Sequence, residues 1–158
     1  MMHEDHDLDE KELPPQKLTL DAQFGTCSIS YDFSRDGVTQ SRFVRIPLKG
    51  GPTGMILLDV HGDNSGNSAF VVVHDASGEQ HLAMITRLAW SGWQDVGVNL
   101  QPLLTSPGQQ QRRAIHWGGD RNQRIDFPIT AVDLGVVKRD GRTSDAGLLQ
   151  FRKIRFEK

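Results

Sequence analysis

The chain has 158 residues, 24% of them charged, and a formal net charge of −2. This length suits one domain with a substantial hydrophobic core. The charge excludes the broad basic surface that sequence-independent nucleic-acid binding requires. The apolar runs are too short to span a bilayer, and no signal-peptide apolar region follows Met1. The single cysteine, Cys27, lies in a strand-like segment and is expected to be a buried thiol.

The first 16 residues differ in composition from the rest of the chain. They are dense in Asp, Glu and His and end near Pro14-Pro15. Such a segment buries too little apolar surface to order itself. We therefore expect residues 1–16 to be a disordered acidic linker and residues 17–158 to form the folded domain.

Short segments rich in β-branched residues follow, separated by turn residues. The expected strands are residues 17–21, 26–33, 41–48, 55–60, 69–74, 80–85, 93–100, 129–137 and 148–156. Sustained helical periodicity is absent, and the strands recur about every ten residues. This pattern predicts an all-β fold, a jelly-roll β-sandwich of two antiparallel sheets.

The segments 55–60 and 69–74 are joined by turn formers and are predicted to pair as a β-hairpin. Alternation places Ile56, Leu58, Val60, Ala69, Val71 and Val73 toward the core. The opposite side carries Leu57, Asp59, His61, Phe70, Val72 and His74. This side is more apolar than a solvated face. Either a second layer of protein or a concave surface buries it, or it is a ligand-binding face.

The tryptophans supply flat rings that suit the apolar face of a sugar. A long patternless segment, residues 101–113, leads to Trp117, which two glycines follow. For Trp117 and Trp90, both in predicted loops, a ligand role and a packing role are both open. Trp93 begins a strand, which favours capping of the core.

Catalytic patterns are absent. His61, His74, His81 and His116 are dispersed, and the sequence contains no GxSxG, HExxH, CxxC or phosphate loop. The residues Asp63, Ser65 and Asn67 superficially resemble a calcium loop but lack its glycine and glutamate positions, so a plain turn is predicted. We expect no enzyme activity and no metal site.

Several short motifs occur in an order that resembles a known family. They are YDFS at 31–34, FVRIP at 43–47, VHGDNSGN at 60–67, HDASG at 74–78, Gly92-Trp93, HWGG at 116–119 and a closing strand with Phe151 and Ile154. Over residues 18–156 the chain resembles the galactose-binding-like jelly-roll modules appended to bacterial secreted glycoside hydrolases and phosphodiester glycosidases. The resemblance implies a noncatalytic, extracellular carbohydrate-binding sandwich. It also implies a structural calcium, but Arg152-Lys153 stand where the closing strand commonly carries acids, which argues against the ion.

The sequence thus predicts a carbohydrate-binding module that targets an attached enzyme to a polysaccharide. Its partners would be a polysaccharide or oligosaccharide and a fused catalytic domain, without nucleic acid or membrane. The expected carbohydrate-binding residues are Trp117, His116, Trp90, Asp120, Asp59, His74 and Phe70. The alternative is a docking or self-association module that uses the apolar side chains of Leu57, Phe70 and Val72.

Overall fold

In the computed structural model the chain is described at residues 17–21, 25–34, 41–104, 116–122, 124–139 and 143–157. Over these residues it is built from strands and one short 3-10 turn. The strands are β1 (Lys17–Asp21), β2 (Thr26–Asp32), β3 (Ser41–Gly50), β4 (Met55–Asp63), β5 (Ser68–His74), β6 (Gln80–Arg87), β7 (Ser91–Asn99), β8 (His116–Trp117), β9 (Ile129–Val137) and β10 (Ala146–Glu157), and η1 spans Gln101–Leu103. The predicted linker, residues 1–16, lies outside the described residues.

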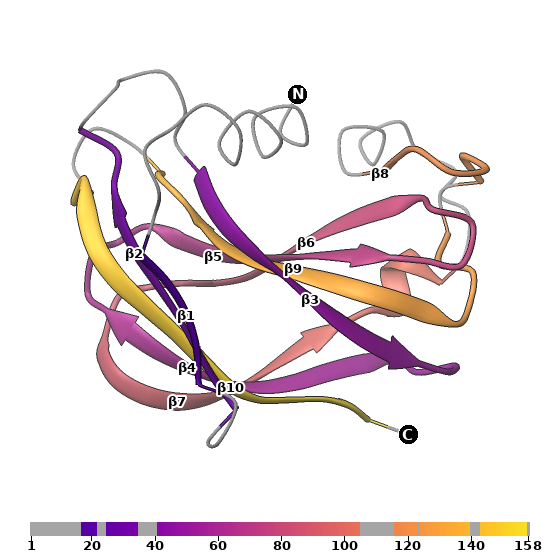
Figure 1. Cartoon of the computed structure of the whole chain (residues 1–158), viewed down its shortest axis with the longest axis horizontal. Helices are drawn as coiled ribbons and strands as arrows, with labels where there is room; N and C mark the ends of the chain where they lie inside the picture. The colour runs from indigo at the N-terminus through magenta and orange to yellow at the C-terminus, as the bar shows by residue number, and fades with distance from the viewer. Residues whose placement is uncertain are drawn as a thin grey trace.

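The strands form two antiparallel sheets that pack face to face (Figure 1). Sheet A has the order β1-β2-β10-β4-β7, and sheet B has the order β3-β9-β5-β6-β8. The predicted jelly-roll sandwich of two antiparallel sheets is therefore confirmed. The strand β8, a two-residue strand, was not predicted, and it pairs with the start of β6 at the edge of sheet B.

The core lies between the two sheets, as alternation along each strand predicts. The predicted core residues Ile56, Leu58 and Val60 of β4 are at most 1% exposed, and Val71 and Val73 of β5 are fully buried. Cys27 is buried as expected, and burial raises the pKa of its thiol to about 11. No helix in the described part of the chain is long and apolar enough to cross a membrane.

The predicted hairpin of β4 and β5 is wrong. Strand β4 pairs with β10 and β7 in sheet A, whereas β5 pairs with β6 and β9 in sheet B. The intervening turn formers carry the chain from one sheet to the other instead of folding it back. Their backbone bonds show this, because Asn64 donates to the carbonyl of Trp90 and Gly66 donates to that of Leu88, in the link between β6 and β7.

This crossing separates the side chains that the hairpin would have joined. Each strand keeps its predicted core side, but Leu57, Asp59 and His61 lie on the outer face of sheet A. Phe70, Val72 and His74 lie on the outer face of sheet B, on the other side of the sandwich. A single apolar docking face made of Leu57, Phe70 and Val72 therefore does not exist.

Candidate functional site

A polar cluster occupies the outer face of sheet B, where strand register brings three strands together. Asp133 of β9 lies directly opposite Arg45 of β3 and Val72 of β5. Its Oδ1 accepts a hydrogen bond from Arg45 Nε at 2.7 Å, and its Oδ2 lies 2.9 Å from Nε2 of His74. The Asp133 side chain is 1% exposed, whereas 47% of Arg45 and 13% of His74 are exposed. The His74 imidazole and the Arg45 guanidinium therefore lie between the Asp133 carboxylate and solvent.

The electrostatics keep Asp133 ionised. Burial alone would raise the pKa of Asp133, but the hydrogen bonds from His74 and Arg45 outweigh burial, so the pKa lies below its ordinary value. Only the carboxylate of this pair is buried, and the cost of desolvating it offsets much of its attraction to the half-exposed Arg45. The cluster is therefore better explained by what it presents at the surface than by what it adds to folding.

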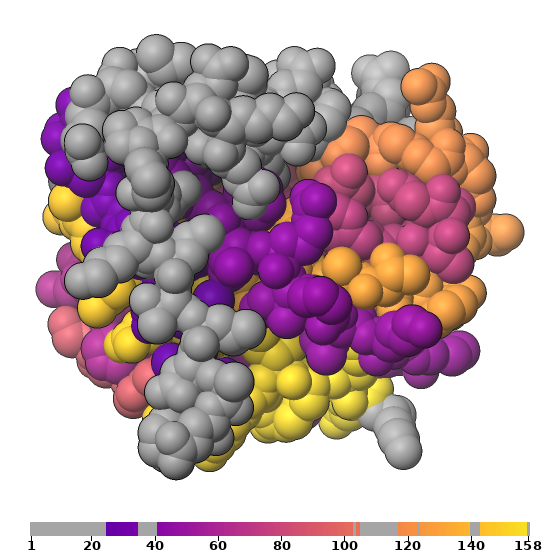
Figure 2. All heavy atoms as spheres, in the orientation of Figure 1, coloured from indigo at the N-terminus to yellow at the C-terminus, as the bar shows by residue number. Residues whose placement is uncertain are grey.

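An apolar cluster lies beside this polar group on the same outer face. It is separate from the main core and contains Phe43, Phe70, Val72, Leu82 and Trp117. Trp117 is 8% exposed and Phe70 is fully buried. Met84, which lies opposite Phe70 on β6, is 44% exposed. The face thus combines a fixed polar centre with apolar neighbours, and Figure 2 shows atoms of β3, β6 and β9 reaching the surface on the right of the view.

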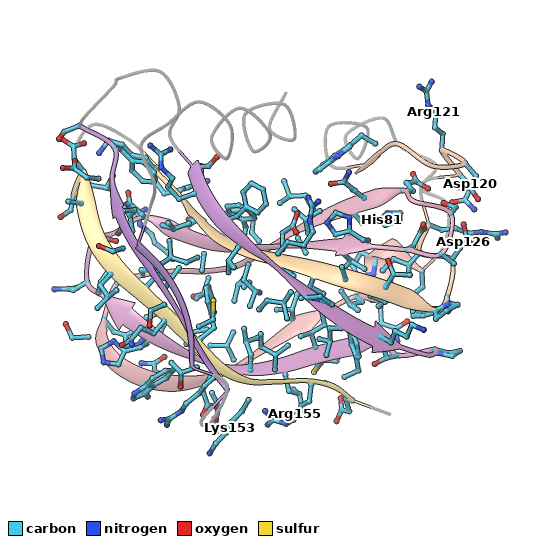
Figure 3. The ribbon with its side chains drawn as sticks, in the orientation of Figure 1. His81, Asp120, Arg121, Asp126, Lys153 and Arg155 are labelled. Atoms are coloured by element: carbon cyan, nitrogen blue, oxygen red, sulfur yellow. The ribbon has the colours of Figure 1, made fainter. Side chains whose placement is uncertain are left out.

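A second polar cluster lies at one end of the sandwich, in the turn after β5 and the segment after β8. Asp75 accepts hydrogen bonds from the backbone nitrogens of Ser77 and Glu79 through Oδ1, and its Oδ2 lies 3.0 Å from Nε2 of the fully buried His81. Burial lowers the pKa of His81, although the bond to Asp75 opposes that shift. Figure 3 shows His81, Asp120 and Asp126 at this end, with Arg121 pointing away from them.

Two sets of side chains in this end cluster have the spacing of metal ligands. They are Asp75, Glu79 and His81, and Glu79, Asp120 and Asp126, each with ligand atoms within 4.8 Å of one another. Carboxylates of the second set suit a hard cation such as calcium. The closing strand does not, because its Arg152 binds the Asp59 carboxylate at 3.1 Å.

The structure brings together some of the predicted carbohydrate-binding residues and separates others. Trp117, Phe70 and His74 share the outer face of sheet B. His116 precedes Trp117 in β8, and its side chain lies outside the described residues. Asp120 is exposed in the end cluster, so it lies beyond the polar centre of sheet B.

Asp59 and Trp90 lie elsewhere. Asp59 is 5% exposed on the outer face of sheet A. Trp90 packs against the main core, and its Nε1 donates to the carbonyl of Gly92 at 2.8 Å, so it has a packing role in this structure. Trp93, predicted to cap the core, instead lies on the outer face of sheet A, where the Arg152 guanidinium stacks on its ring.

Sequence reasoning missed Arg45 and Asp133. Alternation along residues 129–137 does place Asp133 on the outer side, because Val132, Leu134 and Val136 occupy the core side. Its partnership with Arg45 depends on the register between β3 and β9, which joins residues 88 positions apart. A lone aspartate between the core residues Val132 and Leu134 was the available signal.

No family model matches the sequence, and a search of curated proteins found no match. Among solved structures, the chain is similar to a family 11 carbohydrate-binding module from Clostridium thermocellum, in complex with a β-1,3-1,4-mixed-linked tetrasaccharide. The TM-score is 0.56 at 15% sequence identity, and the match covers 89% of this chain and 79% of that chain. At this identity the likeness establishes a shared fold, the jelly-roll β-sandwich.

Proposed function

We propose that this domain is a noncatalytic carbohydrate-binding module whose glycan lies on the outer face of sheet B. The observation that carries the proposal is the Asp133 carboxylate, buried at the centre of that face beneath Arg45 and His74. Planar polar groups held in one orientation suit the hydroxyl pairs of a sugar, because little side-chain entropy is then lost on binding. The fold that this chain shares with a glycan-bound module supports the same function.

In this proposal the polar and apolar parts of the face have different tasks. Arg45 and His74 hydrogen-bond to hydroxyl groups, while Asp133 holds both in place. The exposed part of Met84 and the rim of Trp117 contact the apolar face of a sugar ring. Phe70 supports this surface from below. Affinity would be modest, since a mobile glycan must be ordered on binding.

The wider biological role is also part of the proposal. The domain would be extracellular and would hold an attached polysaccharide-processing enzyme near its polymer. Such a role needs no catalytic group in the module itself, and the resemblance in motif order supports it. The docking alternative loses its basis, since its three residues lie on two different sheets.

Affinity electrophoresis on a panel of neutral polysaccharides, including mixed-linkage β-glucan, tests the proposal. The wild-type protein should be retarded by at least one polymer. The His74→Gln and Arg45→Gln variants should bind that polymer about tenfold more weakly, a loss of about 1.4 kcal/mol. Arg139→Gln, a charge-matched control at an exposed position after β9, should bind as the wild type does.

Circular dichroism separates lost binding from lost folding in these variants. The proposal is wrong if no neutral glycan retards the wild type, or if folded His74→Gln and Arg45→Gln proteins bind as tightly as Arg139→Gln.

A further inference from the structure

The outer face of sheet A carries a tryptophan stacked with a guanidinium. Trp93 of β7 is half-buried, and the Arg152 guanidinium carbon lies 3.9 Å from the centre of its ring. His61 of β4 meets the same ring edge-on, with ring centres 5.1 Å apart. Arg152 also donates from Nε to Oδ2 of Asp59 at 3.1 Å. The contact with the Trp93 ring and the bond to Asp59 thus hold the guanidinium over an aromatic surface.

A β-bulge in β10 concentrates further positive charge on this face. The register of β10 against β4 shifts between Arg152, opposite Asp59, and Arg155, opposite Leu57. Lys153 sits in the bulge with φ at 57°, a left-handed conformation that costs a lysine free energy. Because of the extra residue, Arg152, Lys153 and Arg155 all reach the outer side. Figure 3 shows Lys153 and Arg155 pointing away from the sandwich.

Acidic side chains share this face with the three bases. Asp59 accepts the bond from Arg152, and Lys153 Nζ lies 4.0 Å from the same carboxylate. Asp95 lies directly opposite Asp59 and shares a hydrogen bond with it; this bond lowers the pKa of Asp59 and raises the pKa of Asp95. Among the described residues, no carboxylate lies within ion-pair distance of Arg155, which instead donates to the Lys153 carbonyl at 2.6 Å. Lys153 and Arg155 are therefore exposed bases on this face, with the carboxylates of Asp95 and Glu157 also on it.

A cavity adjoins the bulge and extends the surface available to a ligand. Its volume is about 560 Å3, and its lining includes the apolar side chains of Leu48, Ile154 and Phe156. Two bases, Lys49 of β3 and Arg155, lie among its lining residues with Glu157. Leu48, Ile154 and Phe156 also pack against the main core, so this cavity opens between the two sheets beside the bulge, with Lys49 and Arg155 in its lining.

We propose that the outer face of sheet A is a second binding site, which takes an acidic polysaccharide. The carboxylate or sulfate of a sugar would pair with Lys153 and Arg155, and the ring of that sugar would lie against Trp93 and its stacked guanidinium. The strained backbone at Lys153 supports a functional origin for the bulge, because strain of this kind persists where its product is used. This site uses different residues from those on sheet B, so each of the two sites can be shown to be absent without affecting the case for the other.

Affinity electrophoresis at low ionic strength tests this site with polygalacturonate, alginate and heparin, and with oligothymidylate as a non-sugar polyanion. The wild type should be retarded by at least one acidic polysaccharide and not by oligothymidylate. The double variant Lys153→Gly/Arg155→Gln should bind that polymer at least about tenfold more weakly, because two ionic contacts are lost. Glycine keeps the left-handed backbone that the bulge requires.

The control Arg121→Gln/Arg139→Gln removes the same charge elsewhere, with Arg121 at the other end of the molecule in Figure 3. It should bind within about twofold of the wild type. Retardation by the uronate polymers or by heparin identifies carboxylate or sulfate as the recognised group. The proposal is overturned if no acidic polysaccharide retards the wild type, if oligothymidylate binds equally well, or if both double variants lose the same affinity. His74→Gln should leave this binding unchanged, which separates it from the site on sheet B.

Discussion

His81 and His74 each pair with a buried carboxylate, but they differ in contact with solvent. His81 is fully buried and lies 3.0 Å from Asp75, whose other bonds hold the turn after β5 and the backbone of Asp126. His74 keeps 13% of its side chain exposed above Asp133. The first pair therefore belongs to the framework of the fold, and the second belongs to a surface.

The buried His81 predicts acid sensitivity in a defined pH range. Because burial lowers the pKa of His81, the unfolded chain binds the proton more readily, with an ordinary pKa of about 6.5. The stability from neutral His81 is fully present above about pH 6.5 and is lost as the pH falls toward its folded pKa. Urea unfolding at pH 7.5 and 5.5 should show a loss of about 1 kcal/mol in the wild type.

The His81→Gln variant is the control for this measurement, since glutamine keeps a donor for Asp75 but does not titrate. Its unfolding free energy should change much less between the two pH values. Asp75 and Asp133 do not interfere, because both have a lowered pKa and lose their contribution only below about pH 4. An equal pH effect in the variant would contradict the assignment to His81.

For single residues, the sequence predicted which side chains are buried better than it predicted which side chains are in contact. The alternation of side chains predicted which residues of β4 and β5 face the core, because period two is a local property. It could not predict that Asp133 meets Arg45 or that Trp93 meets Arg152, since both contacts depend on the register of strands distant in sequence. Trp93 was placed at the core because a tryptophan at the start of a strand usually packs there.

Among the elements, β10 departs most from a regular strand. Its register against β4 shifts between Arg152 and Arg155, and Lys153 adopts φ of 57°. Arg155 Nη1 donates to the Lys153 carbonyl at 2.6 Å. The bulge therefore has its own local hydrogen bond, although its backbone conformation disfavours a residue with a side chain.

Replacing Lys153 with glycine should stabilise the domain. Glycine adopts positive φ without the steric cost that lysine has, and part of this gain is offset by the entropy of glycine in the unfolded chain. The expected gain is about 0.5–1 kcal/mol, or a Tm increase of about 2 °C by calorimetry. The control Lys49→Gly, in β3 without positive φ, should lower Tm instead; a decrease of similar size in both variants would refute the explanation.

The wrong hairpin prediction shows that local turn residues do not determine which sheet the next strand joins. Residues 62–67 are turn formers, and Asn64 and Gly66 do adopt positive φ. The chain does bend at these residues, but it does not form the predicted hairpin. Whether the chain returns along the same sheet or crosses to the other depends on the partners available to β4 and β5. Each strand has one partner far from this link in the sequence, β10 for β4 and β9 for β5.

In the whole molecule, the last strand lies in the interior of sheet A. β10 pairs with β2 on one side and β4 on the other, and Leu149 and Phe151 of β10 are fully buried in the core. Pairing of this kind makes assembly depend on contacts between strands that are far apart in the sequence. Two strand edges stay unpaired until β10 is in place.

Removing residues 146–158 should therefore prevent folding of the whole domain, not only remove one strand. The deletion exposes both edges and opens the core at two buried side chains, a loss larger than the about 5–15 kcal/mol that typically stabilises a domain. We expect the truncated chain to be insoluble or to give an unfolded circular-dichroism spectrum. Removing residues 1–16 is the matched experiment, and the shortened protein should keep its cooperative unfolding. A soluble, folded protein lacking residues 146–158 would contradict the topology argument.

The outer faces of sheets A and B point in opposite directions from one thin sandwich. The sheets pack about 10 Å apart, so a rigid polysaccharide that lies flat on one face cannot turn around the edge to reach the other. With both faces occupied, a single domain joins two polymer chains. A mixture of a neutral and an acidic polysaccharide would then gain viscosity when this protein is added, as a network with molecular cross-links does.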